Sequence, residues 1–335
     1  MESRRRLIVL WVTGACQLAC RYCYAAERSG GRMEEPVAFS ALELFKDEPL
    51  TVQFAGGEPL LNWELIEAVT EYVEKQRPGT RLQLQTNGIA MDMQKAIYIR
   101  EHKIAVGVSL DGIPEVNERL RGRTAEVVAG IRTLGEAGVC VNLNAVVTSE
   151  NVQKLPQLVD FAWYLESVAG IGLDLLRAAG RGEREFTRLC AEESVIEQAL
   201  WKMYERSCML ERLSGRKIVF REIDEAARRQ RVGKRLPYCF ASCGNAVAVL
   251  PDGDCYPCGS LAGRPEYYMG NVMGQVHSLR LEPEGVFAES EKCTACPGRL
   301  VCPGACPSRR ILNGESKEDC ALRRTAFQIV EQNDV

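Results

Sequence analysis

The 335-residue sequence has little of several features that would place it quickly in a class. Its net charge is only −3, and basic and acidic residues are interspersed, so it has no basic footprint for nucleic acid. No apolar run approaches the length that spans a membrane. Histidine is scarce, since His102 and His277 are the only two. We therefore expect neither a nucleic-acid nor a membrane partner, and little imidazole for metal binding.

The N-terminus also lacks a convincing export signal. "MESRRRLIVLWVTGAC" has a basic start, a short apolar run and a cysteine, as a lipoprotein signal does. However, two more cysteines follow within seven residues, and "LIVLWVT" is typical of a buried, β-branched strand. We therefore predict a cytoplasmic protein.

Cysteine is what the chain has in abundance, with 15 residues. In a secreted mini-protein such a count would indicate disulfides. In a chain of this length without an export signal, clustered C-x-x-C spacings favour metal binding instead.

Residues 1–180 alternate between short apolar strands and helical stretches. The expected strands are Leu7–Thr13, Leu50–Phe54, Leu82–Gln85, Ala105–Leu110, Val139–Val147 and Ile171–Leu176. The expected helices include Trp63–Gln76, Met91–Arg100, Thr124–Ala137 and Leu155–Glu166. This alternation predicts a parallel sheet with right-handed crossovers. The pattern alone leaves open whether the sheet curves into a partial barrel or stays flat.

The rest of the chain divides into two parts. Residues 181–236 are rich in charge, with apolar positions at helical spacing, and we expect two connecting helices there. Residues 237–335 are dense in Cys, Gly and Pro and end in an expected helix at Ala321–Glu331. Such a segment cannot build a core from apolar burial alone, so we expect metal clusters to stabilise it.

Three cysteines, Cys16, Cys20 and Cys23, follow the first expected strand in the spacing C-x3-C-x2-C. Three thiolates suit a 4Fe–4S cluster in which one iron has no protein ligand. A structural zinc site would need a fourth ligand, and no histidine or further cysteine lies nearby in the sequence. The loop is expected at the carboxyl end of the sheet, where active sites of α/β proteins gather.

The triplet resembles the hallmark of the radical S-adenosylmethionine (SAM) superfamily, and further family motifs follow successive strands. They are "GGEP" at 56–59, "QTNG" at 85–88 and "SLDG" at 109–112, with Arg121 twelve residues after Ser109. Each motif alone could be ordinary turn or surface chemistry, but their order favours the family. The resemblance implies SAM contacts from Tyr22, Gly56, Gly57, Glu58, Thr86, Asn87, Ser109, Asp111, Arg121 and Asn144.

The resemblance also implies a fold and a chemistry. The fold is α/β, a partial (β/α)6 TIM-like barrel followed by a small Cys-rich Fe–S cluster domain. SAM would bind the open iron and be cleaved reductively to a 5′-deoxyadenosyl radical, which abstracts a substrate hydrogen. An electron donor such as flavodoxin or ferredoxin is then required.

The tail motif "CTACPGRLVCPGAC" has the spacing C-x2-C-x5-C-x3-C and resembles a ferredoxin run. With Gly253 and the other tail cysteines it is similar to a SPASM domain, which carries auxiliary clusters. The resemblance implies three 4Fe–4S clusters in all. Auxiliary cluster I would take Cys239, Cys243, Cys258 and Cys306, and auxiliary cluster II would take Cys293, Cys296, Cys302 and Cys320. Four of these cysteines could instead form a zinc ribbon, although nine tail cysteines exceed one zinc.

Cys255 is left over in the tail. We expect it to be a bystander in a hairpin at Asp252–Gly253, and the other possibility is a catalytic redox thiol or substitute ligand. No other catalytic residue is assigned.

Three functions compete. We favour a maturase that forms a thioether or other cross-link in a ribosomally made peptide. The second is an anaerobic sulfatase-maturating enzyme, which makes formylglycine from Cys or Ser, and the third is a non-catalytic zinc- or iron-binding protein. The sulfatase-maturating family carries an aspartate where this chain has Gly259, so its expected base is missing. The chain starts at its first strand, so either a separate protein recognises a leader peptide or the substrate needs none.

Overall fold

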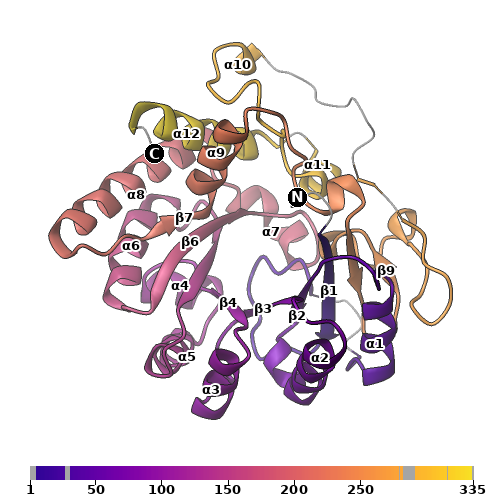
Figure 1. Ribbon diagram of the computed structural model, residues 1–335. Helices are drawn as coiled ribbons and strands as arrows, with labels where there is room; N and C mark the ends of the chain where they lie inside the picture. Colours follow the sequence, from indigo (N-terminus) through magenta and orange to yellow (C-terminus); the bar gives the residue numbers. More distant parts are fainter. Residues whose placement is uncertain (1–4, 27–30, 279, 282–290, 315, 334–335) are drawn as a thin grey trace.

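The computed structural model describes residues 5–26, 31–278, 280–281, 291–314 and 316–333. Its centre is a curved sheet of parallel strands (Figure 1). The first six strands are β1 (Arg6–Thr13), β2 (Leu50–Gly56), β3 (Arg81–Thr86), β4 (Ala105–Ser109), β5 (Val141–Val147) and β6 (Val168–Leu175). They are neighbours in sequence order, and each pair is parallel. The predicted partial (β/α)6 barrel is therefore confirmed.

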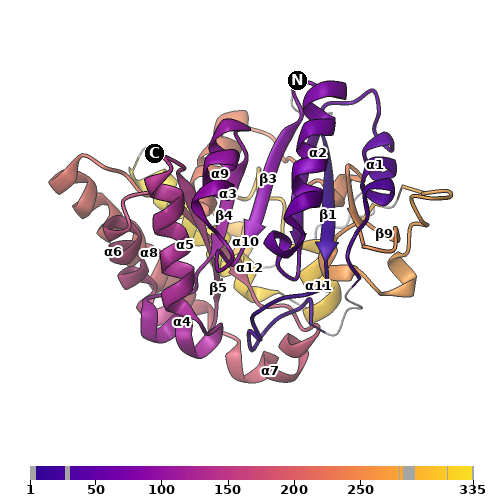
Figure 2. The ribbon, with the colours of Figure 1, turned by 90° about the horizontal axis from the view of Figure 1, so that it is seen from below.

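Helices cover the outside of the barrel, as Figures 1 and 2 show. They are α1 (Glu35–Glu43), α2 (Trp63–Gln76), α3 (Met93–Glu101), α4 (Pro114–Leu120), α5 (Thr124–Glu136) and α6 (Leu155–Tyr164), with short 3-10 turns η2 (Pro59–Asn62) and η3 (Val152–Lys154). Alternate strand residues such as Ile8, Leu10 and Phe54 are buried against these helices. The opposite strand faces line the barrel interior.

The segment after β6 forms three helices where the sequence predicted two. They are α7 (Arg181–Leu189), α8 (Glu193–Ser214) and α9 (Arg221–Val232), with the short strand β7 (Val219–Phe220) before α9. Gly215 and Gly233 take left-handed conformations at the ends of α8 and α9, which is the usual way a glycine ends a helix. β7 pairs with β6 and forms one edge of the sheet.

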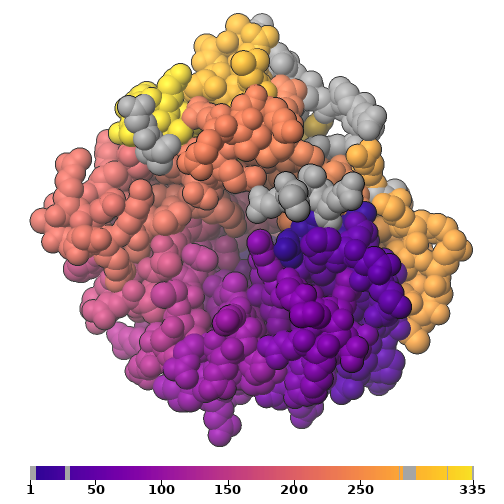
Figure 3. Space-filling model, viewed as in Figure 1, coloured from indigo at the N-terminus to yellow at the C-terminus, as the bar shows by residue number. Residues whose placement is uncertain are grey.

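The C-terminal segment joins the sheet at its other edge. β8 (Ala246–Val249) is parallel to β1, and β9 (Cys255–Tyr256) returns antiparallel to β8 through the expected hairpin. The short turn η4 (Ala241–Cys243) precedes β8, and the turns η5 (Gly259–Leu261) and η6 (Pro265–Tyr267) follow β9. The chain then forms helices α10 (Glu291–Thr294), α11 (Pro307–Asn313) and α12 (Lys317–Asn333). α12 packs against α8 and α9. In Figure 3 the orange and yellow C-terminal atoms lie above the indigo and magenta barrel.

Across the part of the chain that the structure describes, none of the helices combines the length and apolar character of a membrane span.

Candidate active site

The first thiol group lies on the loop that leaves β1. Burial raises the pKa of Cys20 to about 11, and the nearby Cys23 and Cys16 thiols add to that rise. This mutual influence places the three sulfurs in one neighbourhood. Cys16 is exposed and Cys20 is buried, so the group reaches from the protein surface into the barrel mouth.

The "GGEP" turn after β2 packs directly on this loop. The Gly57 amide donates to the Thr13 carbonyl at 2.8 Å, and the Glu58 amide donates to the Ala15 carbonyl at 2.8 Å. A Cβ on Gly57 would lie 2.3 Å from the Ala15 oxygen, so only glycine allows this approach. The adjacent Gly56 has φ of 132°, which also requires glycine.

Glu58 ties the turn to the end of β3. Its buried carboxylate accepts hydrogen bonds from the Leu60 amide at 3.1 Å, the Thr86 hydroxyl at 2.5 Å and the Asn87 amide at 2.7 Å. Burial raises its pKa to about 6, against the opposing effect of these hydrogen bonds. The Asn87 side chain donates to the Cys16 sulfur at 3.8 Å. Glu58, Thr86 and Asn87 therefore lie together beside the first thiol group.

A second polar cluster lies at the end of β4. Asp111 is fully buried and accepts a hydrogen bond from the Tyr22 hydroxyl and another from the Val146 amide at 2.9 Å. Arg121 pairs with Asp111 at 2.9 Å and stacks over the Tyr22 ring, with its Cζ 5.5 Å from the ring centroid. Arg121 is thus a mostly buried arginine near Cys20, with 11% of its side chain exposed.

Two of the predicted SAM contacts, Ser109 and Asn144, are joined by Gln85, which was not among the predicted contacts. Gln85 donates to the Ser109 hydroxyl at 3.1 Å and accepts from the Asn144 amide at 2.6 Å. Gln85 is the first residue of the "QTNG" motif. The motif does not determine which face of β3 carries its side chain, so its position inside the barrel could not be predicted. Seven of the ten residues predicted to contact SAM lie at or just beyond the carboxyl ends of β2, β3 and β4, namely Gly56, Gly57, Glu58, Thr86, Asn87, Ser109 and Asp111. Tyr22 lies on the cysteine loop, Arg121 follows α4, and Asn144 lies in the middle of β5.

The tail thiols form two further groups. Burial raises the pKa of Cys239 to about 12, and the Cys306 and Cys258 sulfurs add to the rise. These three line a cavity of about 460 Å³ between the barrel and the tail. Cys243, also predicted for auxiliary cluster I, is four residues after Cys239, and its thiol donates to the Phe240 carbonyl at 3.4 Å. Its placement in this cavity stays a prediction.

The other tail group matches the second predicted set. Burial raises the pKa of Cys296, Cys302 and Cys320, and Cys293 contributes to the rise in each of the three. Cys239, Cys258 and Cys306 thus influence one another, as do Cys293, Cys296, Cys302 and Cys320. Their assignment to auxiliary clusters I and II stays a prediction.

Cys255 lies away from both tail groups. Its side chain is fully buried in the apolar core, and its thiol donates to the Gly253 carbonyl at 3.5 Å. Burial raises its pKa to about 12, and no other thiol contributes to that rise. This environment suits an inert core cysteine.

The grouped thiols are donors of the kind that Fe–S clusters require. Among the described residues, no three Cys, His, Asp or Glu side chains converge on the position of one metal ion. A 4Fe–4S cluster spreads its four irons over separate corners, so its thiolates need not converge on a point. All 15 cysteines are free thiols. The donor chemistry and grouping therefore suit the predicted clusters.

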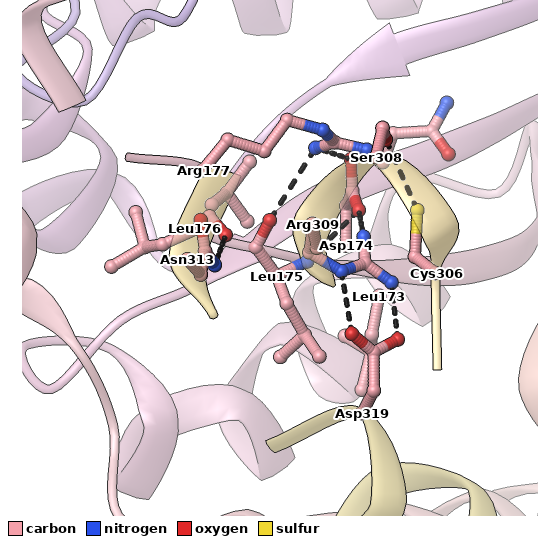
Figure 4. Close-up of polar contacts among 12 residues, drawn as sticks. Leu173, Asp174, Leu175, Leu176, Arg177, Cys306, Ser308, Arg309, Asn313 and Asp319 are labelled. Atoms are coloured by element: carbon pink, nitrogen blue, oxygen red, sulfur yellow. Dashed lines mark hydrogen bonds and ion pairs between the residues drawn. The ribbon is translucent and has the colours of Figure 1, made fainter. Parts of the chain in front are cut away.

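An ion-pair network beside Cys306 connects the tail to the barrel (Figure 4). Arg309 of α11 pairs with Asp174 of β6 at 2.6 Å and with Asp319 of α12, whose Oδ2 lies 2.7 Å from the Arg309 Nε. Arg177 pairs with the other Asp174 oxygen at 2.7 Å. Arg309 and Arg323 hold the pKa of Asp319 below its usual range despite its burial. No sequence pattern indicated this network.

Comparisons with known proteins agree with this geometry. The model of the Radical SAM superfamily matches residues 12–162. An uncharacterized protein of Methanocaldococcus jannaschii is 30% identical, over 86% of this chain and 96% of that protein. The Fe-coproporphyrin III synthase of Methanosarcina barkeri is 32% identical, but over 61% of this chain and 52% of its own length. The serine-type anaerobic sulfatase-maturating enzyme of Bacteroides thetaiotaomicron is 26% identical, over 90% of this chain and 82% of that enzyme.

Two solved structures have the same fold. The first, anSMEcpe with bound AdoMet and the Kp18Cys peptide, has a TM-score of 0.79 at 20% identity, over 98% of this chain and 97% of that one. The second, Streptococcus suis SuiB bound to its precursor peptide SuiA, has a TM-score of 0.68 at 18% identity, over 94% of this chain and 74% of that one. With the family match and the relative that aligns along nearly its whole length, the chain belongs to the radical SAM superfamily and is an enzyme of that family.

Proposed function

We propose that the enzyme is a peptide maturase that oxidatively forms a thioether or another cross-link in a ribosomally made peptide. The observation that carries the proposal is the separation of the thiols into an open group of three at the barrel mouth and two groups in the tail. The solved structures of anSMEcpe and SuiB with peptides bound support a peptide as substrate.

In this proposal each polar cluster at the barrel mouth has a role. Cys16, Cys20 and Cys23 would hold a 4Fe–4S cluster, which with bound SAM would supply radical chemistry for hydrogen abstraction. Glu58 fixes the glycine turn against the cysteine loop, so the turn's backbone can face the methionine part of SAM. The Arg121–Asp111 pair closes the mouth beside Cys20 and excludes water there.

Partners outside the chain are also part of the proposal. An electron donor such as flavodoxin or ferredoxin would reduce the first cluster, and a separate protein could present the leader of the peptide substrate. After hydrogen abstraction the substrate radical must lose a second electron. The two tail groups, as auxiliary clusters I and II, would accept that electron.

The choice between cross-link and formylglycine depends on Gly259. A Cβ added to Gly259 would lie 3.3 Å from Cζ3 of Trp11, which is buried on β1. A side chain at this position would therefore require the indole to move by a few tenths of an ångström. The absence of the expected base favours the cross-link.

Formylglycine formation is the second candidate. The similarity to the sulfatase-maturating enzyme of Bacteroides thetaiotaomicron extends over 90% of this chain. Asp252 and Asp254 lie in the β8–β9 turn and are the acidic residues that could replace the missing base, and Asp254 accepts a hydrogen bond from the Asn271 amide at 2.8 Å. The Asp254 carboxylate is thus already engaged by a neighbouring side chain.

The metal content tests the first part of the proposal. Three 4Fe–4S clusters predict about twelve irons per chain after anaerobic reconstitution, with matching sulfide. Replacing Cys16, Cys20 and Cys23 together with alanine should leave about eight irons and abolish 5′-deoxyadenosine formation. The control is Cys140→Ala at an exposed cysteine outside the three groups, which should keep all the iron. Stoichiometric zinc with about four irons would reject the auxiliary clusters.

The product tests the reaction. Short peptides encoded beside the gene are incubated with enzyme, SAM and reductant, and the products are analysed by mass spectrometry with a hydrazine reagent. We expect loss of two hydrogens and no hydrazone. A hydrazone at a former Cys or Ser would establish the sulfatase-type reaction instead.

A further inference from the structure

A second cavity, of about 350 Å³, lies inside the barrel and is lined by side-chain amides. Its wall is formed by the inward faces of β2 to β6 and by the start of α9. The amides are those of Gln53, Gln83, Gln85, Asn142 and Asn144. These five primary amides lie on three strands, β2, β3 and β5, and contrast with the interior of a closed (β/α)8 barrel, which is filled mainly with branched apolar side chains.

Three of these amides are free to bind a ligand. Among the described residues, the side chains of Gln53, Gln83 and Asn142 have no hydrogen-bond partner. Gln83 and Asn142 are exposed, so the cavity opens to solvent near the amino ends of β3 and β5. An amide that is solvated in the free enzyme can exchange its water for a ligand at little cost.

Glycines on the neighbouring strands make room for the amides. A Cβ on Gly107 would lie 2.5 Å from the Asn144 nitrogen and 2.6 Å from the Gln85 oxygen. A Cβ on Gly170 would lie 2.8 Å from the Asn142 oxygen. Strands β4 and β6 thus have glycine where the amide side chains of β3 and β5 occupy the space that a Cβ would need.

The five amides, which we call the amide wall, extend from the predicted SAM site to the cavity lined by the tail cysteines. At its carboxyl end Gln85 is hydrogen-bonded to Ser109 at 3.1 Å, and Ser109 is a predicted SAM contact. On its other side Gln53 and Arg221 also line the cavity that holds Cys239, Cys258 and Cys306. A ligand on the wall would therefore lie between the SAM site and the thiols of predicted auxiliary cluster I.

The charges around the cavity favour an uncharged ligand. The charged residues that line it are Arg221 and Asp224, one of each sign, and Arg221 is already paired with Glu222 at 2.7 Å. A ligand rich in carboxylates would require an excess of positive charge that this wall does not have.

We propose that this amide wall binds the main chain of the substrate peptide in an extended form, an inference that rests on the proposed function. A primary amide presents one acceptor and two donors, which complement the C=O and N–H of a peptide unit. Such pairing recognises the backbone and not the side chains, so the site would hold peptides of differing sequence. Gln53, Gln83 and Asn142 are the residues assigned to this contact.

Binding to the reconstituted enzyme tests the inference without turnover. The probe is N-acetyl-trialanine N-methylamide, titrated by saturation-transfer NMR, together with an analogue whose middle amide is an ester. We expect Gln83→Leu and Asn142→Leu each to weaken binding of the amide probe roughly three- to tenfold, the equivalent of one hydrogen bond. The matched control is Gln94→Leu on the exposed face of α3, which should bind like the wild type.

A second variant guards against misfolding. Ala105, at the amino end of β4, is exposed and lines the cavity, so Ala105→Phe should fill it and abolish probe binding while SAM binding and melting temperature stay unchanged. The ester should bind the wild type more weakly than the amide, and Gln83→Leu should reduce that difference.

Wild-type affinity in all the leucine variants, or no probe binding by the wild type at millimolar concentrations, would overturn the inference. The proposed function fails separately, through iron content or product mass. If the enzyme cross-links its peptide but fails these binding tests, the role of the amide wall is rejected and the proposed function stands.

Discussion

Glu58 is a buried carboxylate whose two oxygens accept three hydrogen bonds at the barrel mouth. In Glu58→Gln an NH2 group replaces one oxygen and meets a backbone donor, Leu60 or Asn87, so a buried donor loses its partner. We expect a loss of about 1–3 kcal/mol in unfolding free energy. The control is Glu64→Gln, whose side chain is 87% exposed and should change stability by less than about 0.5 kcal/mol. Equal melting temperatures for the two variants would contradict this account.

The same residue makes a pH prediction. Burial raises the pKa of Glu58 from 4.5 to about 6, so the folded state binds a proton that the unfolded state has lost between these values. The contribution of Glu58 to stability is therefore largest at low pH and falls as pH rises through about 6. The stability difference between wild type and Glu58→Gln should shrink between pH 5 and pH 7, measured by thermal unfolding. A difference that grows with pH would show that the carboxylate is stabilised as an anion.

Single residues were predictable where a motif fixes them to a strand end. Arg121 and Asp111 could be named from "SLDG" and its spacing, yet their burial against Tyr22 follows from the packing of three loops. Gln83 and Asn142 carry no motif. Their common orientation depends on strand register, which sequence alone leaves undetermined.

Among the elements, α11 is connected to β6 and α12 by one side chain, Arg309. Its replacement by methionine keeps the volume but leaves the Asp174 and Asp319 carboxylates without that partner. Asp319 is almost fully buried, so we expect a loss of about 3–5 kcal/mol. The matched control is Lys75→Met in the Lys75–Glu71 pair, where both side chains are more than half exposed and the cost should be about 0–1 kcal/mol. Denaturant unfolding measures both, and similar midpoints would contradict a structural role for Arg309.

Element prediction succeeded where periodicity is strong. The six barrel strands and the helices α2, α3, α5 and α6 lie where alternation of apolar segments placed them. The short helices α1 and α4 were missed because each starts at or next to a proline and spans too few turns for a periodic pattern. β8 was missed because four residues, "AVAV", within a Cys- and Gly-rich segment give no strand signal of their own.

For the molecule as a whole, the missed strand changes how the tail relates to the barrel. The sequence predicted a tail that metal clusters stabilise separately, whereas β8 extends the barrel sheet beside β1. Residues Ala246–Val249 are buried and lie opposite Leu7–Leu10. The tail therefore has two sources of order, a sheet that needs no metal and thiol groups that do.

This division predicts a graded response to iron removal. After anaerobic chelation, hydrogen exchange should speed up in residues 293–314, because metal-binding energy there is also folding energy. The amides of Leu7–Leu10 and Ala246–Val249 should stay protected, since their ladder is formed by backbone pairing and apolar burial. Val106 and Leu143, deep in the barrel, serve as internal references. If protection at Ala246–Val249 fell together with that of residues 293–314, the tail would fold as one metal-dependent unit, and β8 would be a consequence of cluster binding and not an independent anchor.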